Sequence, residues 1–100
     1  MPKFKVDAKS SLSPDETFQK IKTMLESDKD LRKLDNYVCQ FDETKRTGTA
    51  KGAKFEASMN VLAQTSGSTV AIEVSLPMLL TPLKGVVQST LEKKLGALLG

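Results

Sequence analysis

KFEASMNVLAQTSGSTVAIEVSL, residues 54–76, alternates between apolar and polar side chains more regularly than the rest of the chain. This period of two places every second side chain on the same face of a β-strand. The small polar run Ser66–Ser68 interrupts it, which predicts two antiparallel strands joined by a hairpin turn. Pro77 ends the second strand because proline has no N–H to donate to a neighbouring strand. The apolar face, which another layer must cover, carries Phe55, Ala57, Met59, Val61, Ala63, Val70, Ile72, Val74 and Leu76.

A first helix is predicted upstream of this hairpin. Ser13 is a good N-cap and Pro14 suits the first helical position, so the helix is expected to begin there. Apolar side chains at spacings of three and four then continue to about Asp28. Leu31 and Leu34 either extend this helix or pack from a loop.

Three further strands are predicted at residues 3–9, 36–42 and 44–50, giving the order β-α-β-β-β-β-α once the final helix is included. Consecutive strands joined by short turns pair antiparallel. The predicted fold class is therefore α+β: a two-layer sandwich in which an antiparallel sheet of four to five strands is covered on one face by two helices. One hundred residues is the size of one domain, which we assign to residues 1–100.

The last twenty residues predict an amphipathic helix that begins near Thr81-Pro82. A start directly after Pro77, with Pro82 kinking or breaking the segment, is the alternative. The apolar band of this helix is wider than the ~100° stripe that a surface helix needs. Burial of the whole band in the core is the simpler interpretation, and exposure of part of it as a binding surface is the other. The candidate surface residues are Leu83, Val86, Val87 and Leu91, with Lys84 as a candidate polar contact.

Alanines alternate with larger side chains on the predicted inner face of the sheet, at Ala8, Ala57 and Ala63. They either let a helix approach the sheet closely or leave a cleft that takes an apolar ligand. Close packing is the favoured interpretation because native interiors rarely leave voids.

The chain carries few of the side chains that catalysis or metal binding requires. It has no histidine, and its single cysteine, Cys39, cannot form a zinc cluster and is predicted to point into the core. The remaining acid–base candidates are Glu56 and Glu73 with Lys54, on the solvated face of the sheet. Exposed carboxylates lack the burial that tunes an acid–base pair. We therefore predict no catalytic residues, no metal site and no cofactor, and expect a protein that is not an enzyme.

The composition of the chain points to no special class of partner. The net charge of +3 is mild, and no aromatic residues interleave the basic ones, so no nucleic-acid partner is expected. No apolar run approaches the ~18 residues that span a bilayer, and no apolar signal segment follows Met1. A lone cysteine fits a reducing compartment. The expected location is cytoplasmic.

The run Leu76–Gly85, LPMLLTPLKG, resembles the signature of the polyhydroxyalkanoic acid system proteins, a family of small bacterial proteins named for genes near polyhydroxyalkanoate granule loci. The resemblance covers nearly the full chain, including a Gly-x-x-x-Gly segment like Gly48–Gly52 and a Leu-Pro-x-x-Leu-x-Pro-Phe-Lys-Gly run into a last helix. Leu83 stands where that pattern often has Phe, and Thr81 where it often has Arg. The resemblance implies a bacterial cytoplasmic protein without an established activity, because the family name reflects gene neighbourhood.

Two functions remain open from the sequence. The first is a non-catalytic accessory or binding protein, which contacts an acyl ligand or an apolar polymer granule through its final helix and the adjoining sheet edge. The alternative is a homodimeric or protein–protein interaction module without a small-molecule ligand. That module would use the small residues Gly85, Ser89 and Gly96 or an exposed strand edge.

Overall fold

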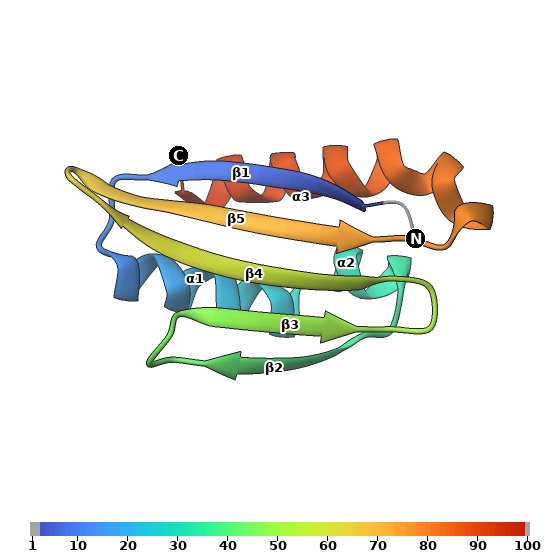
Figure 1. The fold of residues 1–100 in the computed structure, drawn as a ribbon, viewed down its shortest axis with the longest axis horizontal. Helices are drawn as coiled ribbons and strands as arrows, with labels where there is room; N and C mark the ends of the chain where they lie inside the picture. Colours follow the sequence, from blue (N-terminus) through green and yellow to red (C-terminus); the bar gives the residue numbers. More distant parts are fainter. Residues whose placement is uncertain (1–2, 100) are drawn as a thin grey trace.

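The computed structural model describes residues 3–99, including their side chains except that of Leu34. Its five strands form one antiparallel sheet with the helices on one face, as predicted (Figure 1). The order of the strands in the sheet, β1-β5-β4-β3-β2, is not given by the sequence. Among residues 3–99, no helix is both long and apolar enough to cross a bilayer. The elements are β1 (Lys3–Ser10), α1 (Pro14–Ser27), α2 (Lys29–Leu34), β2 (Val38–Asp42), β3 (Thr47–Lys51), β4 (Glu56–Gln64), β5 (Gly67–Ser75), the 3-10 helix η1 (Met78–Leu83) and α3 (Lys84–Leu99).

The β4–β5 hairpin pairs as its alternation predicts, with Met59 opposite Ile72 and Val61 opposite Val70. The turn differs from the prediction. Gln64 pairs with Gly67, so the turn consists of residues 65–66, and Ser68 belongs to β5. Gly67 has a φ of 140°, and a Cβ there would clash with the carbonyl oxygen of Ser10 on the neighbouring strand. Only glycine allows β5 to begin this close to β1.

The first helix begins as predicted, because the Ser13 side chain accepts the N–H of Glu16. It ends at Asp28, whose backbone is extended and whose carboxylate accepts the N–H of Leu31. Asp28 is therefore the N-cap of a separate short helix, α2. The buried Leu31 lies on α2, so it neither extends α1 nor packs from a loop. The part of the prediction that concerns the Leu34 side chain lies outside the described residues.

The final helix begins later than the predicted start near Thr81-Pro82. A 3-10 helix runs from Met78 through Pro82 to Leu83, and the α-helix begins only at Lys84. The alternative of a start after Pro77 is nearer to the structure, because proline lacks the N–H that an α-helical bond at this point would use. The buried stripe of α3 repeats every four residues, at Val87, Leu91, Leu95 and Leu99.

Three hydroxyl side chains join β1, α1 and β5 inside the protein. The Thr17 hydroxyl oxygen lies 2.9 Å from that of Ser10 and 2.7 Å from that of Ser68. The Ser68 hydroxyl also donates to the Leu12 carbonyl oxygen, at 3.0 Å. Thr17 is fully buried, so the network is shielded from water. Each hydroxyl has a partner, which is the condition for burying polar groups without a large cost.

Replacing Thr17 with valine keeps its shape but leaves Ser10 and Ser68 without this partner. We expect the free energy of unfolding to fall by about 1–2 kcal/mol, as for other buried hydroxyls that lose a hydrogen bond. Thr17→Ser is the control, because it keeps the hydroxyl and removes one methyl group, at a cost of about 0.8 kcal/mol. Urea denaturation measures both values, and a Thr17→Val protein as stable as the wild type would show that the network contributes nothing.

Candidate functional site

An apolar cavity lies between the sheet and the helices. On the helix side its wall is formed by Leu25 near the end of α1, Leu31 of α2, and Val87 and Leu91 of α3; these helices lie over one face of the sheet (Figure 1). Small inward-facing residues deepen the sheet side at this place: Gly48, Ala50 and Ala57. The lining residues are Leu25, Leu31, Tyr37, Gly48, Thr49, Ala50, Phe55, Ala57, Ser58, Met59, Ile72, Val74, Val87 and Leu91.

Almost all of the cavity wall is apolar, and the tyrosine at its edge offers no free hydrogen-bonding group. The Tyr37 hydroxyl donates to the Leu25 carbonyl oxygen at 2.6 Å. Among the described residues, no buried side-chain nitrogen or oxygen lacks a partner. The cavity therefore suits the apolar part of a ligand, and any polar part has to remain at its mouth.

The cavity is small. The centre of a water molecule can occupy about 40 Å³ of it, and the total free space between its lining atoms, mouth included, is about 500 Å³. On the first measure one water needs roughly 10–15 Å³, so the empty cavity has room for a few waters at most. Met59, whose unbranched thioether side chain adapts to irregular spaces, and the half-buried Phe55 lie in its wall. These dimensions suit the end of an alkyl chain better than a large ring system.

A second, smaller pocket adjoins the cavity, and we call it the outer groove. Phe55 and Val87 line both, so these two side chains form the boundary between them. The groove runs along η1 and the first turn of α3, and Lys54 is the charged residue in its wall. The groove residues are Lys54, Phe55, Leu76, Leu80, Leu83, Val86 and Val87.

The β3–β4 loop, which carries Lys54 and Phe55, is held in place by a buried carboxylate. Asp35 Oδ2 accepts the backbone N–H of Lys54 at 2.8 Å and that of Phe55 at 3.2 Å. A Cβ on Gly52 would clash with the same carboxylate, so glycine lets the loop wrap around it. Asp35 thus positions the mouth of the cavity, although it does not line it.

The residues predicted as an apolar binding surface fall into two sets. Leu83 and Val86 are exposed and line the outer groove, whereas Val87 and Leu91 are buried and line the cavity. Val87 and Leu91 are thus not part of an outer surface, because the period of the helix turns them toward the sheet. Lys84 is exposed at the start of α3, with its Nζ 5.9 Å from the centre of the Phe4 ring.

The three alanines predicted on the inner face of the sheet also fall into two sets. Ala57 lines the cavity, so the cleft that sequence reasoning ranked second is present there. Ala8 and Ala63 do not line it, and Ala63 is exposed near the end of β4. The lining residues Ala50 and Gly48 were not singled out, because a short threonine-rich strand gives no signal for which of its small residues face a helix.

The remaining chemical candidates lie apart from the cavity. Cys39 is half-buried beside the Leu25 carbonyl oxygen, and burial raises the pKa of its thiol. Glu73 lies on the outer face of the sheet with Lys3, at 3.6 Å, and Glu56 is exposed on the same face. Neither carboxylate lines the cavity or the outer groove.

Tyr37 gives a spectroscopic test of this burial. Removal from water raises its pKa to about 12 from an ordinary value of 10.0, and nearby Cys39 adds to the shift. The folded protein then holds the phenolic proton more tightly than the unfolded chain, so folding is favoured below pH 10 and this contribution is lost as the pH rises toward 12. Absorbance at alkaline pH should show the single tyrosine ionising near 12 in the native protein and near 10 in denaturant. A native midpoint near 10 would mean that the ring is solvated.

Comparison with known proteins shows a shared fold. No family model matches the chain, and no curated protein matches it at a significant level. TTHA0849 from Thermus thermophilus superposes with a TM-score of 0.62 at 14% identity, over 98% of this chain and 92% of that one. Ara h 8.0201 gives 0.60 at 16% identity, over 95% and 91%. The di-domain ARO/CYC BexL from the BE-7585A biosynthetic pathway gives 0.73 at 10% identity, over 99% of this chain and 45% of that one. The chain therefore shares its fold with these structures, which is a distant structural similarity to helix-grip proteins of the START and Bet v 1 type.

Proposed function

We propose that the chain is a binding module without catalytic activity, which holds a small apolar ligand between its sheet and α3. The observation that carries this proposal is the apolar cavity between Ala57 and Leu91, with the smaller pocket that adjoins it at Phe55 and Val87. The helix-grip fold supports it, because proteins of this fold typically bind hydrophobic ligands in the corresponding space. The small volume favours a short acyl or alkyl chain over a long one.

A role at polyhydroxyalkanoate granules in a bacterial cytoplasm is a finer form of the same proposal. It is supported by the resemblance of Leu76–Gly85 and by the apolar Leu83 and Val86, which stay exposed. A granule-forming polymer is itself built from short hydroxyacyl units, so a module that holds a short acyl chain fits such a role. Binding of the purified protein to polyhydroxyalkanoate particles above the level of a size-matched control tests this form separately.

Intrinsic fluorescence tests ligand binding without a label. The chain has one tyrosine and no tryptophan, and Tyr37 lies against the cavity with its ring 6.4 Å from that of Phe55. Titration with 1-octanol, octanoate and palmitate should change the fluorescence of Tyr37 saturably. The shorter chains should bind at least as tightly as palmitate, because the cavity buries only a short segment. A linear, unsaturable response to all three would mean that no defined site exists.

Self-association is the second candidate function, and one observation favours it. β2 is an edge strand, and Val38 at its start has 69% of its surface exposed. An uncovered edge is a template for pairing with another strand. Sedimentation equilibrium distinguishes the candidates, because a protein that remains monomeric at high concentration while binding octanol is a ligand-binding module.

A further inference from the structure

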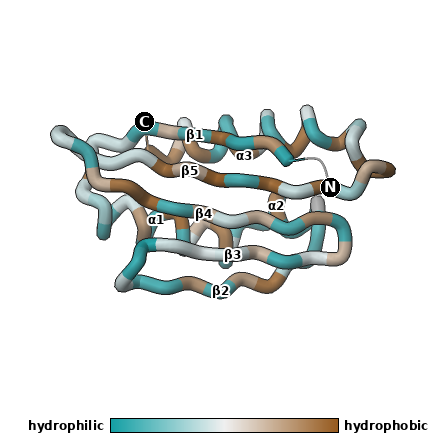
Figure 2. Tube along the Cα trace, viewed as in Figure 1, coloured by the Kyte–Doolittle hydropathy of each residue, from teal (hydrophilic) through white to brown (hydrophobic). Residues whose placement is uncertain are grey.

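The most exposed large apolar side chains of the described residues lie on η1. Leu79 is 93% exposed and Met78 is 79% exposed, and the exposed Leu83 and Val86 follow them along the chain. We call these four residues the η1 patch. Figure 2 shows the hydrophobic colour of η1 at the far end of the molecule, beyond the sheet. A continuous exposed apolar patch on a small protein marks a contact surface.

The patch is presented by a stiff element. Pro77 precedes η1 and Pro82 lies within it, and both prolines have a fixed φ. The Leu80 N–H donates to the Pro77 carbonyl oxygen at 2.9 Å, which closes the first turn. Leu80 turns inward to line the groove, whereas Met78 and Leu79 point outward. The backbone of this segment therefore holds two large apolar side chains in water.

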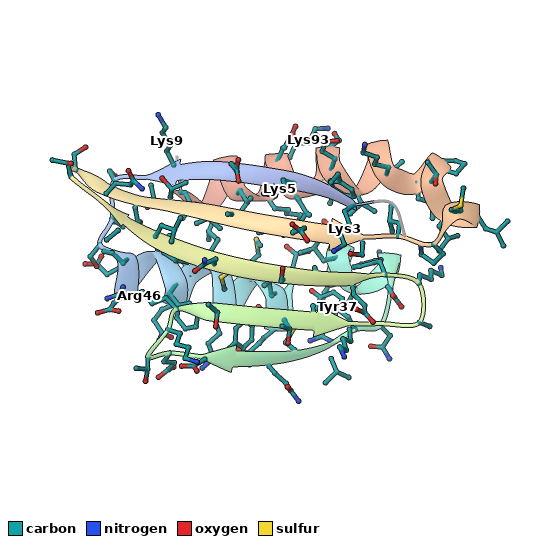
Figure 3. All side chains as sticks on the ribbon, in the orientation of Figure 1. Lys3, Lys5, Lys9, Tyr37, Arg46 and Lys93 are labelled. Carbon is teal, nitrogen blue, oxygen red and sulfur yellow. The ribbon has the colours of Figure 1, made fainter. Side chains whose placement is uncertain are left out.

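The charges around the η1 patch are mostly basic. Between Val74 and Leu91 the sequence contains no acidic residue, and Lys84 is its one charged residue. Lys54 borders the groove beneath η1. Lys3 of β1 and Glu56 of β4 both lie opposite Ser75, at the same end of the sheet, and Glu73 partly offsets the charge of Lys3 (Figure 3). Exposed apolar side chains flanked by lysines complement a surface that has anionic headgroups above an apolar layer.

We propose that the η1 patch docks onto an anionic lipid surface, with Met78 and Leu79 entering the apolar layer and Lys84 and Lys54 at the headgroups. A second protein is a poorer occupant, because a stable protein interface takes roughly 20–30 residues from each side and the patch has four. Leu80, Leu83 and Val86 line the outer groove, so docking of the patch brings this pocket close to the lipid. Only this last consequence rests on the proposed ligand binding.

Vesicle flotation tests the docking with the full chain. Wild-type protein should float with vesicles of equal parts phosphatidylcholine and phosphatidylglycerol, and less with pure phosphatidylcholine vesicles. Met78→Ser/Leu79→Ser should reduce the bound fraction about tenfold or more, because both side chains lose their apolar contact. Lys84→Glu should weaken binding in low salt and matter less in high salt. The exposure of these three residues means that the substitutions leave the core intact, which circular dichroism checks.

The matched control is Val38→Ser/Leu62→Ser, which removes two exposed apolar side chains from β2 and β4. It should float like the wild type. If both double variants lose vesicle binding equally, or if Met78→Ser/Leu79→Ser loses none, the proposal is overturned. A wild-type dimer that becomes monomeric in Met78→Ser/Leu79→Ser also overturns it, in favour of a second copy as occupant. Octanol binding that persists in Met78→Ser/Leu79→Ser shows that the cavity functions whether or not docking occurs.

Discussion

Replacing Ala57 with leucine is expected to weaken the binding of 1-octanol about fiftyfold, because the added atoms occupy the space that the alkyl chain needs. Ala57 lies on β4 opposite Val74, and its side chain points into the cavity between the sheet and α3. Leucine adds three carbon atoms where the centre of a water molecule has only about 40 Å³ available. Displacing three methylene groups of the ligand costs about 2.4 kcal/mol, which is the basis of the expected loss.

The same strand provides the control for Ala57→Leu. Ala63 lies on the same face of β4, is exposed, and does not line the cavity. Ala63→Leu should therefore bind octanol like the wild type. Tyr37 fluorescence titration measures both affinities, and thermal denaturation shows whether either variant has lost its fold. Two variants that weaken binding equally would show that octanol binds somewhere other than this cavity.

Replacing Asp35 with alanine is expected to lower the free energy of unfolding by about 3 kcal/mol, because hydrogen bonds to a buried charged acceptor contribute about 1.5–3 kcal/mol each. The substitution leaves the N–H groups of Lys54 and Phe55 without their acceptor. It also opens space beside Gly52, so the β3–β4 loop is no longer held against the protein. Because Phe55 forms the boundary between groove and cavity, octanol should dissociate faster from this variant.

Asp35→Asn keeps an oxygen acceptor at this position but removes the negative charge. One atom, Oδ2, accepts both N–H groups, so an asparagine carbonyl oxygen can take its place. We expect Asp35→Asn to lose less than half the stability that Asp35→Ala loses. Urea denaturation gives both values, and stopped-flow fluorescence gives the dissociation rates. An Asp35→Ala protein with wild-type stability would contradict the role of this carboxylate in holding the loop.

Much of the fold could be predicted because several local sequence patterns indicate the same arrangement of strands and helices. The alternation in residues 54–76 and the Ser13-Pro14 helix start each specify one element, and together they leave one way to cover the sheet. The predicted element boundaries are wrong where a single side chain determines the backbone conformation. Asp28 ends one helix and caps the next, and no periodicity reveals that double role. Pro82 lies inside a 3-10 segment, which sequence spacing cannot distinguish from the first turn of an α-helix.

The candidate site was predictable only in part. Burial of the whole apolar band of the last helix, the simpler interpretation of the sequence, is wrong for Leu83 and Val86, which stay exposed. The cavity depends on how the ends of α1 and α2 and the start of α3 pack over Ala57, which is a property of long-range packing. Asp35 is even less predictable, because its partners at Lys54 and Phe55 are about twenty residues away along the chain.

Methionine methyl groups offer the most direct test of the central claim, that an apolar ligand binds in the cavity. Met59 lines the cavity, Met24 is buried outside it, and Met78 is exposed on η1. In protein labelled with ¹³C at the methionine methyl groups, 1-octanol should shift the Met59 signal saturably and leave those of Met24 and Met78 in place. A stationary Met59 signal at saturating octanol, with or without movement of Met78, would contradict binding in the cavity.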